Sequence, residues 1–252
     1  MIYVEYLRAR TALVWHAGAL GVLLLLVLST NHRTAVIVDG HPAVTAGLPI
    51  ALSWLVPIAV FFGAIYASSV GASLNRENAT RDISWTKPIP RTALAVQFVL
   101  VDLAGVAIAF TLAMLAAIVV VARIGAVPLF DAAFVPQFVL GLGVAAMWYA
   151  SIQVLTFWFG SGARVAGGIL WPVALIALGI AHVPGPYGAL ARALDVINPL
   201  AYVSGFGVSA SGSGHAESML GSLPVEERAL IVWFFTALFC GIAVTLWPRK
   251  EA

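Results

Sequence analysis

Long apolar runs that are almost free of charge constrain the fold of this chain more than any other feature. They include 12–29, 50–72, 92–122 and 230–247. A helix needs about 20 mainly apolar residues to cross a hydrocarbon core that is about 30 Å thick. Within that core only helices or closed barrels satisfy every backbone group, and these runs lack the alternation of barrel strands. The sequence therefore predicts an all-α polytopic membrane protein.

We expect a single transmembrane domain over 1–252 with six transmembrane helices, because composition leaves no separate soluble domain. Apolar residues make up 62% of the chain and charged residues 10%, against about 45–50% and about 25% in soluble domains. An alternative for the first helix is a cleaved signal peptide with a basic start, but five more spans follow it. The third span is longer than a membrane requires, so it should tilt or extend into water. The spans are expected at 13–29, 50–72, 92–122, 134–159, 165–183 and 229–247.

Basic residues set the expected orientation, since cytoplasmic loops carry an excess of Lys and Arg. With the N-terminus in the cytoplasm, most of the 13 Lys and Arg residues fall on the cytoplasmic side. An even number of spans returns the C-terminus to the same side, so both termini are expected to be cytoplasmic. The basic residues thus mark topology and imply no nucleic-acid partner. Those on the cytoplasmic side are Arg8, Arg10, Arg76, Arg81, Lys87, Arg91, Arg164, Arg249 and Lys250.

Most signals of enzyme chemistry are missing from the chain. It has no G-x-x-x-x-G-K-[ST] phosphate loop, so it should not hydrolyse ATP alone. Its five histidines are scattered, and none has a second ligand at metal spacing, so we expect no metal site. The single cysteine, Cys240, lies in the last span and excludes an intramolecular disulfide. We therefore predict no catalytic residue.

The connection after the second span is longer and more structured than a simple turn. It begins as a charged, helix-compatible segment, and Pro88 and Pro90 then bias the residues before them away from helix. One interpretation is a solvated loop that only anchors topology. The other is a short amphipathic element that docks onto a soluble partner, which would explain Trp85.

Two stretches resemble the ABC-2-type transporter permeases. Glu77, a spacer and then 84–91 resemble the segment which that family carries between its second and third spans, although Pro90 replaces the family's Ser. The stretch 190–202 resembles the family's outer re-entrant segment, expected here over 184–210 as one or two short helices. The resemblance covers nearly the whole chain in layout but only these two stretches in motif. Its outer motif residues are Asn198, Pro199 and Tyr202.

The resemblance implies the permease subunit of an ABC exporter in the bacterial cytoplasmic (inner) membrane. Cytoplasmic ATPase subunits would bind ATP and Mg, this chain would bind no cofactor, and a second permease copy or paralogue would complete a dimer. The segment 74–91 would be the coupling helix, and 1–11 a near-horizontal N-terminal helix. The residues implied to couple to the ATPase are Glu77, Arg81, Asp82, Trp85, Lys87, Pro88 and Arg91.

Asp102 is the charged residue that lies deepest in a predicted span, ten residues into the third, or about 15 Å along the helix. Charges at such depth are rare and suggest function, although a protonated or packing Asp is the alternative. No Lys or Arg is expected at its depth. With Gln97, Tyr149 and Gln153 it forms a possible translocation path, although those three residues could instead hydrogen-bond between helices.

Two other function classes stay open from the sequence. An intramembrane enzyme needs paired polar groups at matching depth, and Asp102 stands alone in that respect. A non-transporting assembly or sensor subunit is compatible with the same layout. An apolar bundle also leaves the substrate open between lipids, drugs, peptides and glycans.

Overall fold

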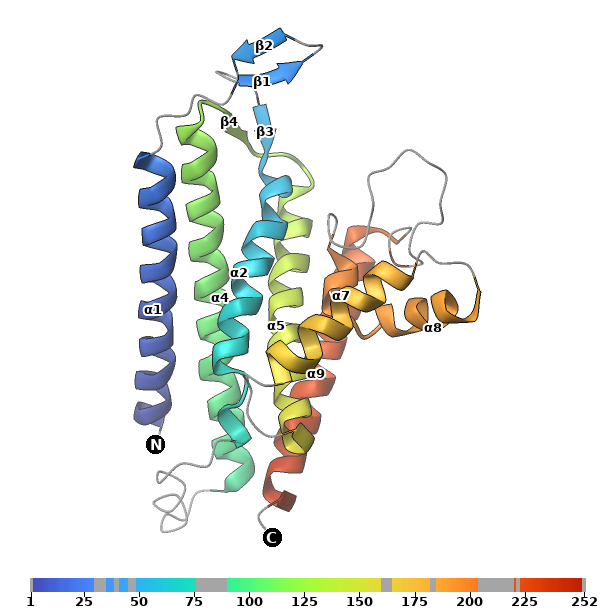
Figure 1. Cartoon of the computed structure of the whole chain (residues 1–252). Helices are drawn as coiled ribbons and strands as arrows, with labels where there is room; N and C mark the ends of the chain where they lie inside the picture. Colours follow the sequence, from blue (N-terminus) through green and yellow to red (C-terminus); the bar gives the residue numbers. More distant parts are fainter. Residues whose placement is uncertain are drawn as a thin grey trace.

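The computed structural model describes residues 2–29, 35–38, 41–44, 49–75, 90–159, 165–181, 185–203, 220 and 223–250. Within them, five helical segments are long and apolar enough to cross a membrane. Both termini lie at one end of the bundle (Figure 1), which we call the inner end, and the opposite end is the outer end. The five helices are α1 (Ile2–Ser29), α2 (Val56–Val70, preceded by η1, Leu52–Leu55), α4 (Arg91–Arg123), α5 (Phe134–Phe159) and α9 (Val225–Lys250).

The core lies where α2, α4 and α5 meet, and α9 packs along α5. The largest side chains that are fully buried there include Tyr66 of α2, Phe110 of α4, and Trp148 and Tyr149 of α5. On the far side of α4, α1 is peripheral, and Ala9 and Leu20 are its buried residues among the side chains described. Most apolar side chains of α1 therefore face outward, as lipid-facing residues of a membrane helix do.

The N-terminal segment differs from the near-horizontal helix that the family resemblance implied. α1 is continuous from Ile2 to Ser29, so 2–11 extends the first span instead of lying apart from it. No proline interrupts this stretch, and nothing local therefore ends the helix. The consequence is that Arg8 is carried into the bundle.

The third predicted span, 92–122, agrees with α4 to within one residue at each end. α4 starts after Pro90, whose carbonyl accepts a hydrogen bond from the Leu94 amide at 3.1 Å. It ends at Arg123, two residues before Gly125, which has a φ of 84°. The amides of Gly125 and Ala126 bond back to the carbonyls of Ala122 and Val121, which is the Schellman arrangement that a left-handed glycine permits. The 33 residues of α4 span about 50 Å at 1.5 Å per residue, so α4 exceeds the hydrocarbon core as expected.

Short strands close the outer end, where the sequence suggested only loops. β1 (Ala35–Val38) pairs antiparallel with β2 (His41–Val44), and β3 (Pro49–Ala51) pairs parallel with β4 (Val127–Leu129). Asp131 reinforces the second pair, since its carboxylate accepts a hydrogen bond from the Ser53 amide at 3.2 Å. Desolvation acts to raise the pKa of Asp131, but the hydrogen bonds from Ser53 and from the Asp131 and Ala133 backbone together hold that pKa below its usual range.

The fifth predicted span, 165–183, corresponds to a continuous helical stretch over 165–180, and 182–183 lie outside the described residues. A π-helical turn, η3 (Ala166–Leu170), precedes α7 (Trp171–Ile180). Pro172 cannot donate to the carbonyl four residues earlier, and the Trp171 amide bonds to Ala166, five residues back. Together η3 and α7 cover about 22 Å at 1.5 Å per residue, which is less than the core of about 30 Å.

The chain must nevertheless return to the outer end after α5. The indole of Trp233 donates to the Val139 carbonyl at 3.3 Å, and Thr236 donates to that of Gly143 at 3.5 Å. Residue numbers rise together in these pairs, so α5 and α9 run in parallel. Since both helices run toward the inner end, the stretch between them must return outward, and Figure 1 shows α7 slanting obliquely outward beside the bundle.

Two short helices follow α7 within the predicted outer segment. They are α8 (Pro186–Asp195) and the single-turn η4 (Pro199–Tyr202). α8 packs against α7, while η4 contacts α5, α7 and α9. In Figure 1, α7 and α8 project sideways from the four-helix body formed by α1, α2, α4 and α5.

Candidate functional site

A buried polar cluster joins four helices near the inner end, and we call Arg8, Ser73, Asp102, Tyr149 and Gln153 the inner polar network. Asp102 is 0% exposed at its centre. One of its carboxylate oxygens accepts from Arg8 Nη2 at 2.6 Å, and the other accepts from the Tyr149 hydroxyl at 3.0 Å. The ion pair and the hydrogen bond together occupy both oxygens, so the carboxylate is fully engaged inside the bundle.

Arg8 also reaches the end of a second helix. Its Nη1 donates to the carbonyl of Val70 at 3.3 Å, and Val70 is the last residue of α2. Cations are favourable at a helix C-terminus, where carbonyls lack intrahelical partners. Arg8 of α1 therefore contacts α4 and the end of α2 at once, using the fixed fork of its guanidinium.

The network continues from Tyr149 toward the chain that leaves α2. Gln153, one turn along α5, donates to the Tyr149 hydroxyl at 2.8 Å and also to the Ser73 hydroxyl. Its amide oxygen accepts from the Leu74 backbone at 3.5 Å. Ser73 and Leu74 belong to η2 (Ser73–Asn75), so the first residues after α2 are tied to α5.

Close packing fixes the same exit from α2. A Cβ on Gly71 would lie 2.7 Å from Cγ2 of Ile152 in α5 and 2.8 Å from the Ala67 carbonyl oxygen. Such distances are shorter than van der Waals contact. Position 71 therefore requires glycine, and the backbone of the α2 exit lies directly against α5.

Gly71→Ala is expected to lower the free energy of unfolding by about 1–3 kcal/mol, as overpacking in a tight site does. The added methyl must displace Ile152 or the end of α2. Thermal unfolding of the purified protein in detergent measures the change. Gly18→Ala is the matched control, because a Cβ there meets nothing within 4 Å. Equal melting temperatures for the two variants would contradict the close approach.

The structure brings together three of the four residues proposed for a translocation path. Asp102, Tyr149 and Gln153 are all fully buried and lie in one network. Gln97 is half-buried on α4, five residues before Asp102. Whether any of these residues contacts a substrate stays a prediction, and their observed contacts are between helices.

The expectation that no basic residue lies at the depth of Asp102 is wrong, because Arg8 pairs with it. Depth was counted from the start of the third span, yet α4 begins below the start of α1 (Figure 1). That offset brings residue 8 of one helix level with residue 102 of the other. If 2–29 forms one helix, Arg8 lies on the same face as Ala12, His16 and Leu20. This spacing is the feature of the sequence that could have indicated that Arg8 faces the bundle.

The residues proposed to couple to an ATPase lie largely outside the described residues. This holds for Glu77, Arg81, Asp82, Trp85, Lys87 and Pro88. Arg91 is described, and it is exposed at the start of α4. The structure thus places the two ends of the segment 74–91, with Leu74 buried in the bundle and Arg91 at the inner end.

The outer motif residues hold the short helices together. Asn198 caps η4 by accepting from the Leu200 amide, and it donates to the Ala174 carbonyl of α7 at 3.1 Å. Tyr202 donates to the Val196 carbonyl at 2.7 Å, and the buried Arg228 of α9 donates to the Tyr202 carbonyl at 3.2 Å. Burial, and after it the charge of Asp195, raise the pKa of Tyr202 to about 12.

Two apolar grooves flank the outer half of α1. One, of about 170 Å³, is lined by apolar side chains of α1, α2 and α4, and another, of about 240 Å³, lies between α1 and α4. Leu20 and Leu24 line both. The inner half has closer contacts, because the Tyr66 hydroxyl donates to the Ala9 carbonyl at 3.1 Å. α1 is therefore fastened at its inner end and only loosely packed further out.

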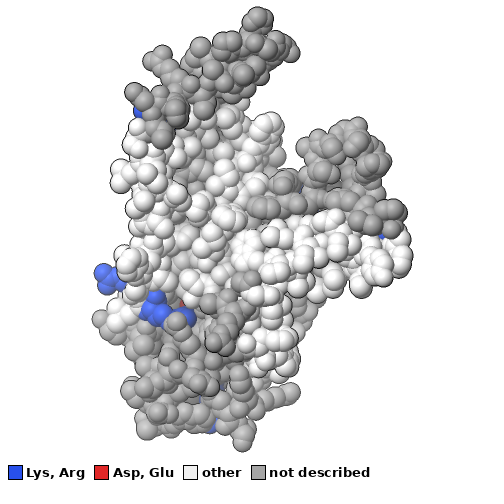
Figure 2. Space-filling model, viewed as in Figure 1, with Lys and Arg blue, Asp and Glu red and all other residues white. Residues whose placement is uncertain are grey.

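Charged side chains are sparse over the described surface. Figure 2 shows a wide white belt, with the blue basic groups of the lower half lying toward the inner end. Among the described residues, no group of three His, Cys, Asp or Glu side chains could hold a metal ion.

Comparison of the chain with family models, with curated proteins and with solved structures gives no match. The class of protein therefore rests on its own architecture. Five long apolar helices around a packed core define a multi-pass helical membrane protein.

Proposed function

We propose that the chain is the permease subunit of an ABC-2-type exporter, driven by a separate cytoplasmic ATPase. It would pair with a second permease copy or paralogue in a bacterial inner membrane. The inner end would face the cytoplasm, with α7 as the return crossing that makes six spans in all. The two motif resemblances supply the family, and the termini at a common end agree with the expected orientation.

The observation that carries the proposal is the attachment of the α2 exit to the inner polar network. The proposed coupling segment starts at Leu74, whose amide bonds to Gln153 of α5. Its neighbour Ser73 bonds to Gln153, and through Tyr149 the network reaches Asp102 of α4 and Arg8 of α1. A displacement of the segment would therefore act on three helices besides α2, as transmission from an ATPase requires.

The same geometry weakens the case for an intramembrane enzyme. Such an enzyme needs a reactive polar group open to its substrate. Asp102 is fully enclosed, and both of its oxygens are engaged by Arg8 and Tyr149. A role in positioning helices accounts for these contacts without a substrate.

Glu77→Ala and Trp85→Ala are each expected to weaken binding of the ATPase encoded by a neighbouring gene. Truncating a central interface residue costs about 2 kcal/mol or more, which is roughly a thirtyfold loss of affinity. Co-purification from detergent and stimulation of ATP hydrolysis in lipid nanodiscs measure the effect.

Glu227→Ala and Trp54→Ala are the matched controls for these two variants. Both residues are exposed, and they lie toward the outer end of the bundle, Glu227 in the first turn of α9 and Trp54 in η1. The proposal fails if the wild-type chain neither binds nor stimulates the ATPase. The assignment of 74–91 as the coupling segment fails if Glu77→Ala and Trp85→Ala bind the ATPase as well as the two control variants do.

A further inference from the structure

The guanidinium of Arg8 contacts both α4 and the end of α2. The role that this placement suggests rests on the proposed function. The two terminal nitrogens of Arg8 contact different helices, Asp102 of α4 and the last carbonyl of α2. The end of α2 leads directly into the proposed coupling segment. Arg8 thus connects the N-terminal helix to the point where force would enter the bundle.

The attachment is local to the inner end of α1. Next to Arg8, Ala9 is buried and its carbonyl accepts from Tyr66. Farther out, α1 borders the two apolar grooves and buries only Leu20 among its described side chains. Because α1 is held mainly at its inner end, we expect that end to move together with α2 and α4, to which it is bonded.

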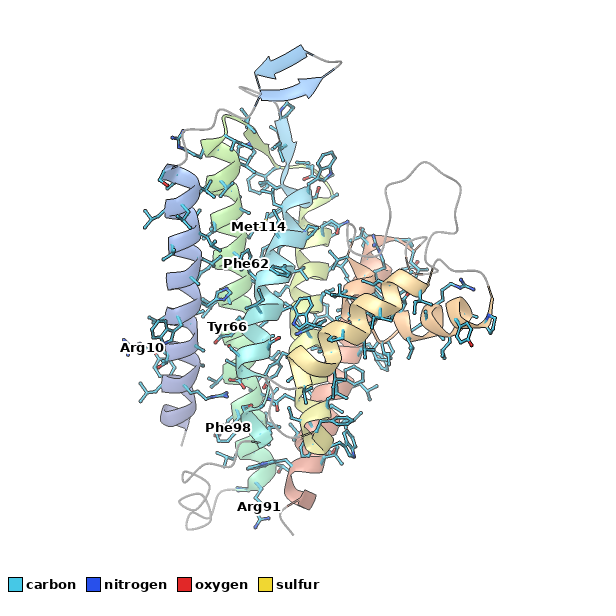
Figure 3. All side chains as sticks on the ribbon, viewed as in Figure 1. Arg10, Phe62, Tyr66, Arg91, Phe98 and Met114 are labelled. Atoms are coloured by element: carbon cyan, nitrogen blue, oxygen red, sulfur yellow. The ribbon has the colours of Figure 1, made fainter. Side chains whose placement is uncertain are left out.

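The neighbouring basic residue shows that this placement is specific. Arg10 lies two residues further along α1, about 200° around a helix of 3.6 residues per turn. It is exposed and points away from the bundle (Figure 3). Positive charge near the inner end is thus available on both faces of α1, and only Arg8 joins the network.

We propose that Arg8 is a positioning residue that makes the inner end of α1, the α2 exit and α4 move as one unit when the ATPase acts. The ion pair with Asp102 holds α1 to α4, and the bond to Val70 holds both to the α2 exit. Without the pair, the coupling segment would still bind the ATPase, but its movement would no longer be carried to α1.

A double variant separates positioning from simple stabilisation. Arg8→Ala alone leaves a buried carboxylate without its cation and can fail to fold, whereas Arg8→Met/Asp102→Leu replaces the whole pair with apolar side chains of similar size. The wild type, this double variant, Arg8→Lys and Arg10→Ala are each combined with the ATPase in nanodiscs. Melting temperature, ATPase binding and stimulation of ATP hydrolysis are then measured.

The double variant is expected to melt and bind like the wild type but to lose stimulation about tenfold, within the 5- to 150-fold range of typical couplings. Arg8→Lys should be intermediate, because a single ammonium lacks the fork that reaches both helices. Arg10→Ala should match the wild type. Wild-type stimulation by a stable, ATPase-bound double variant would overturn the proposal.

A second readout does not depend on the ATPase. Nitroxide labels at Tyr6→Cys and Leu100→Cys, both exposed sites, report the position of α1 against α4 in a Cys240→Ala background. The double variant should broaden the distribution of label separations. An unchanged distribution would overturn the proposal that Arg8 holds the inner end of α1 to α4. Failure of the wild-type chain to bind or stimulate the ATPase would instead overturn the proposed function, so the two failures are distinguishable.

Discussion

Arg8→Ala is expected to lower the free energy of unfolding by about 3–5 kcal/mol, the cost of leaving one member of a buried ion pair uncompensated. The remaining carboxylate, Asp102, is 0% exposed, so it would stay buried without its cation. Asp102→Ala should cost less. The side chain of Arg8 is 16% exposed, and its long stem allows the charged head to move toward the interface.

The control for this prediction is the removal of both charges. Arg8→Met/Asp102→Leu should lie within about 1 kcal/mol of the wild type, because well-packed apolar residues often replace buried ion pairs without loss. Unfolding in detergent, followed by loss of helical circular dichroism, gives all three values. A double variant that is no more stable than Arg8→Ala would contradict the prediction that the cost comes from the uncompensated charge.

Trp148→Ala is expected to cost about 3–5 kcal/mol, the usual range for removing a buried Trp from a core. Trp148 is 0% exposed on α5, and its indole donates to the Ser68 hydroxyl of α2 at 3.1 Å. Its ring lies 4.4 Å from that of Trp171 at the start of α7. The substitution therefore removes one of the aromatic contacts of α7, and it should loosen α7 as well as the core.

Trp158→Ala provides the comparison on the same helix. Trp158 is 64% exposed, so its loss should change stability by less than about 0.5 kcal/mol. Trp148→Phe keeps an aromatic ring beside Trp171 but loses the bond to Ser68, which should cost about 1 kcal/mol. Thermal unfolding ranks the three variants, and equal effects at positions 148 and 158 would contradict the packing described.

The long helices could be predicted because each is set by its own residues. The expected span 134–159 has the same bounds as α5, and 92–122 differs from α4 by one residue at each end. In the fifth span the stretch 165–180 is helical as expected, but its first turn is a π-turn that precedes Pro172, and apolar content does not reveal that irregularity. The strands were missed because they are only three or four residues long, and β3 pairs with a segment far along the chain.

The candidate site was only half visible in the sequence for a different reason. Asp102, Tyr149 and Gln153 stand out as polar groups within apolar spans. Arg8 does not, because a basic residue before a first span is normally a topology signal. Its pairing with Asp102 depends on the offset of α1 against α4, and that offset results from packing between helices that no local pattern encodes.

The ion pair also implies an order of assembly during synthesis. Arg8 and Asp102 are 94 positions apart, so at about 5–20 residues per second Arg8 emerges roughly 5–20 s before its partner. During that interval the N-terminal helix can cross the membrane, but it lacks the contact that fixes its inner end. The span that carries Asp102 must enter the membrane before α1 can settle, so α1 reaches its final position only after α4 has been made.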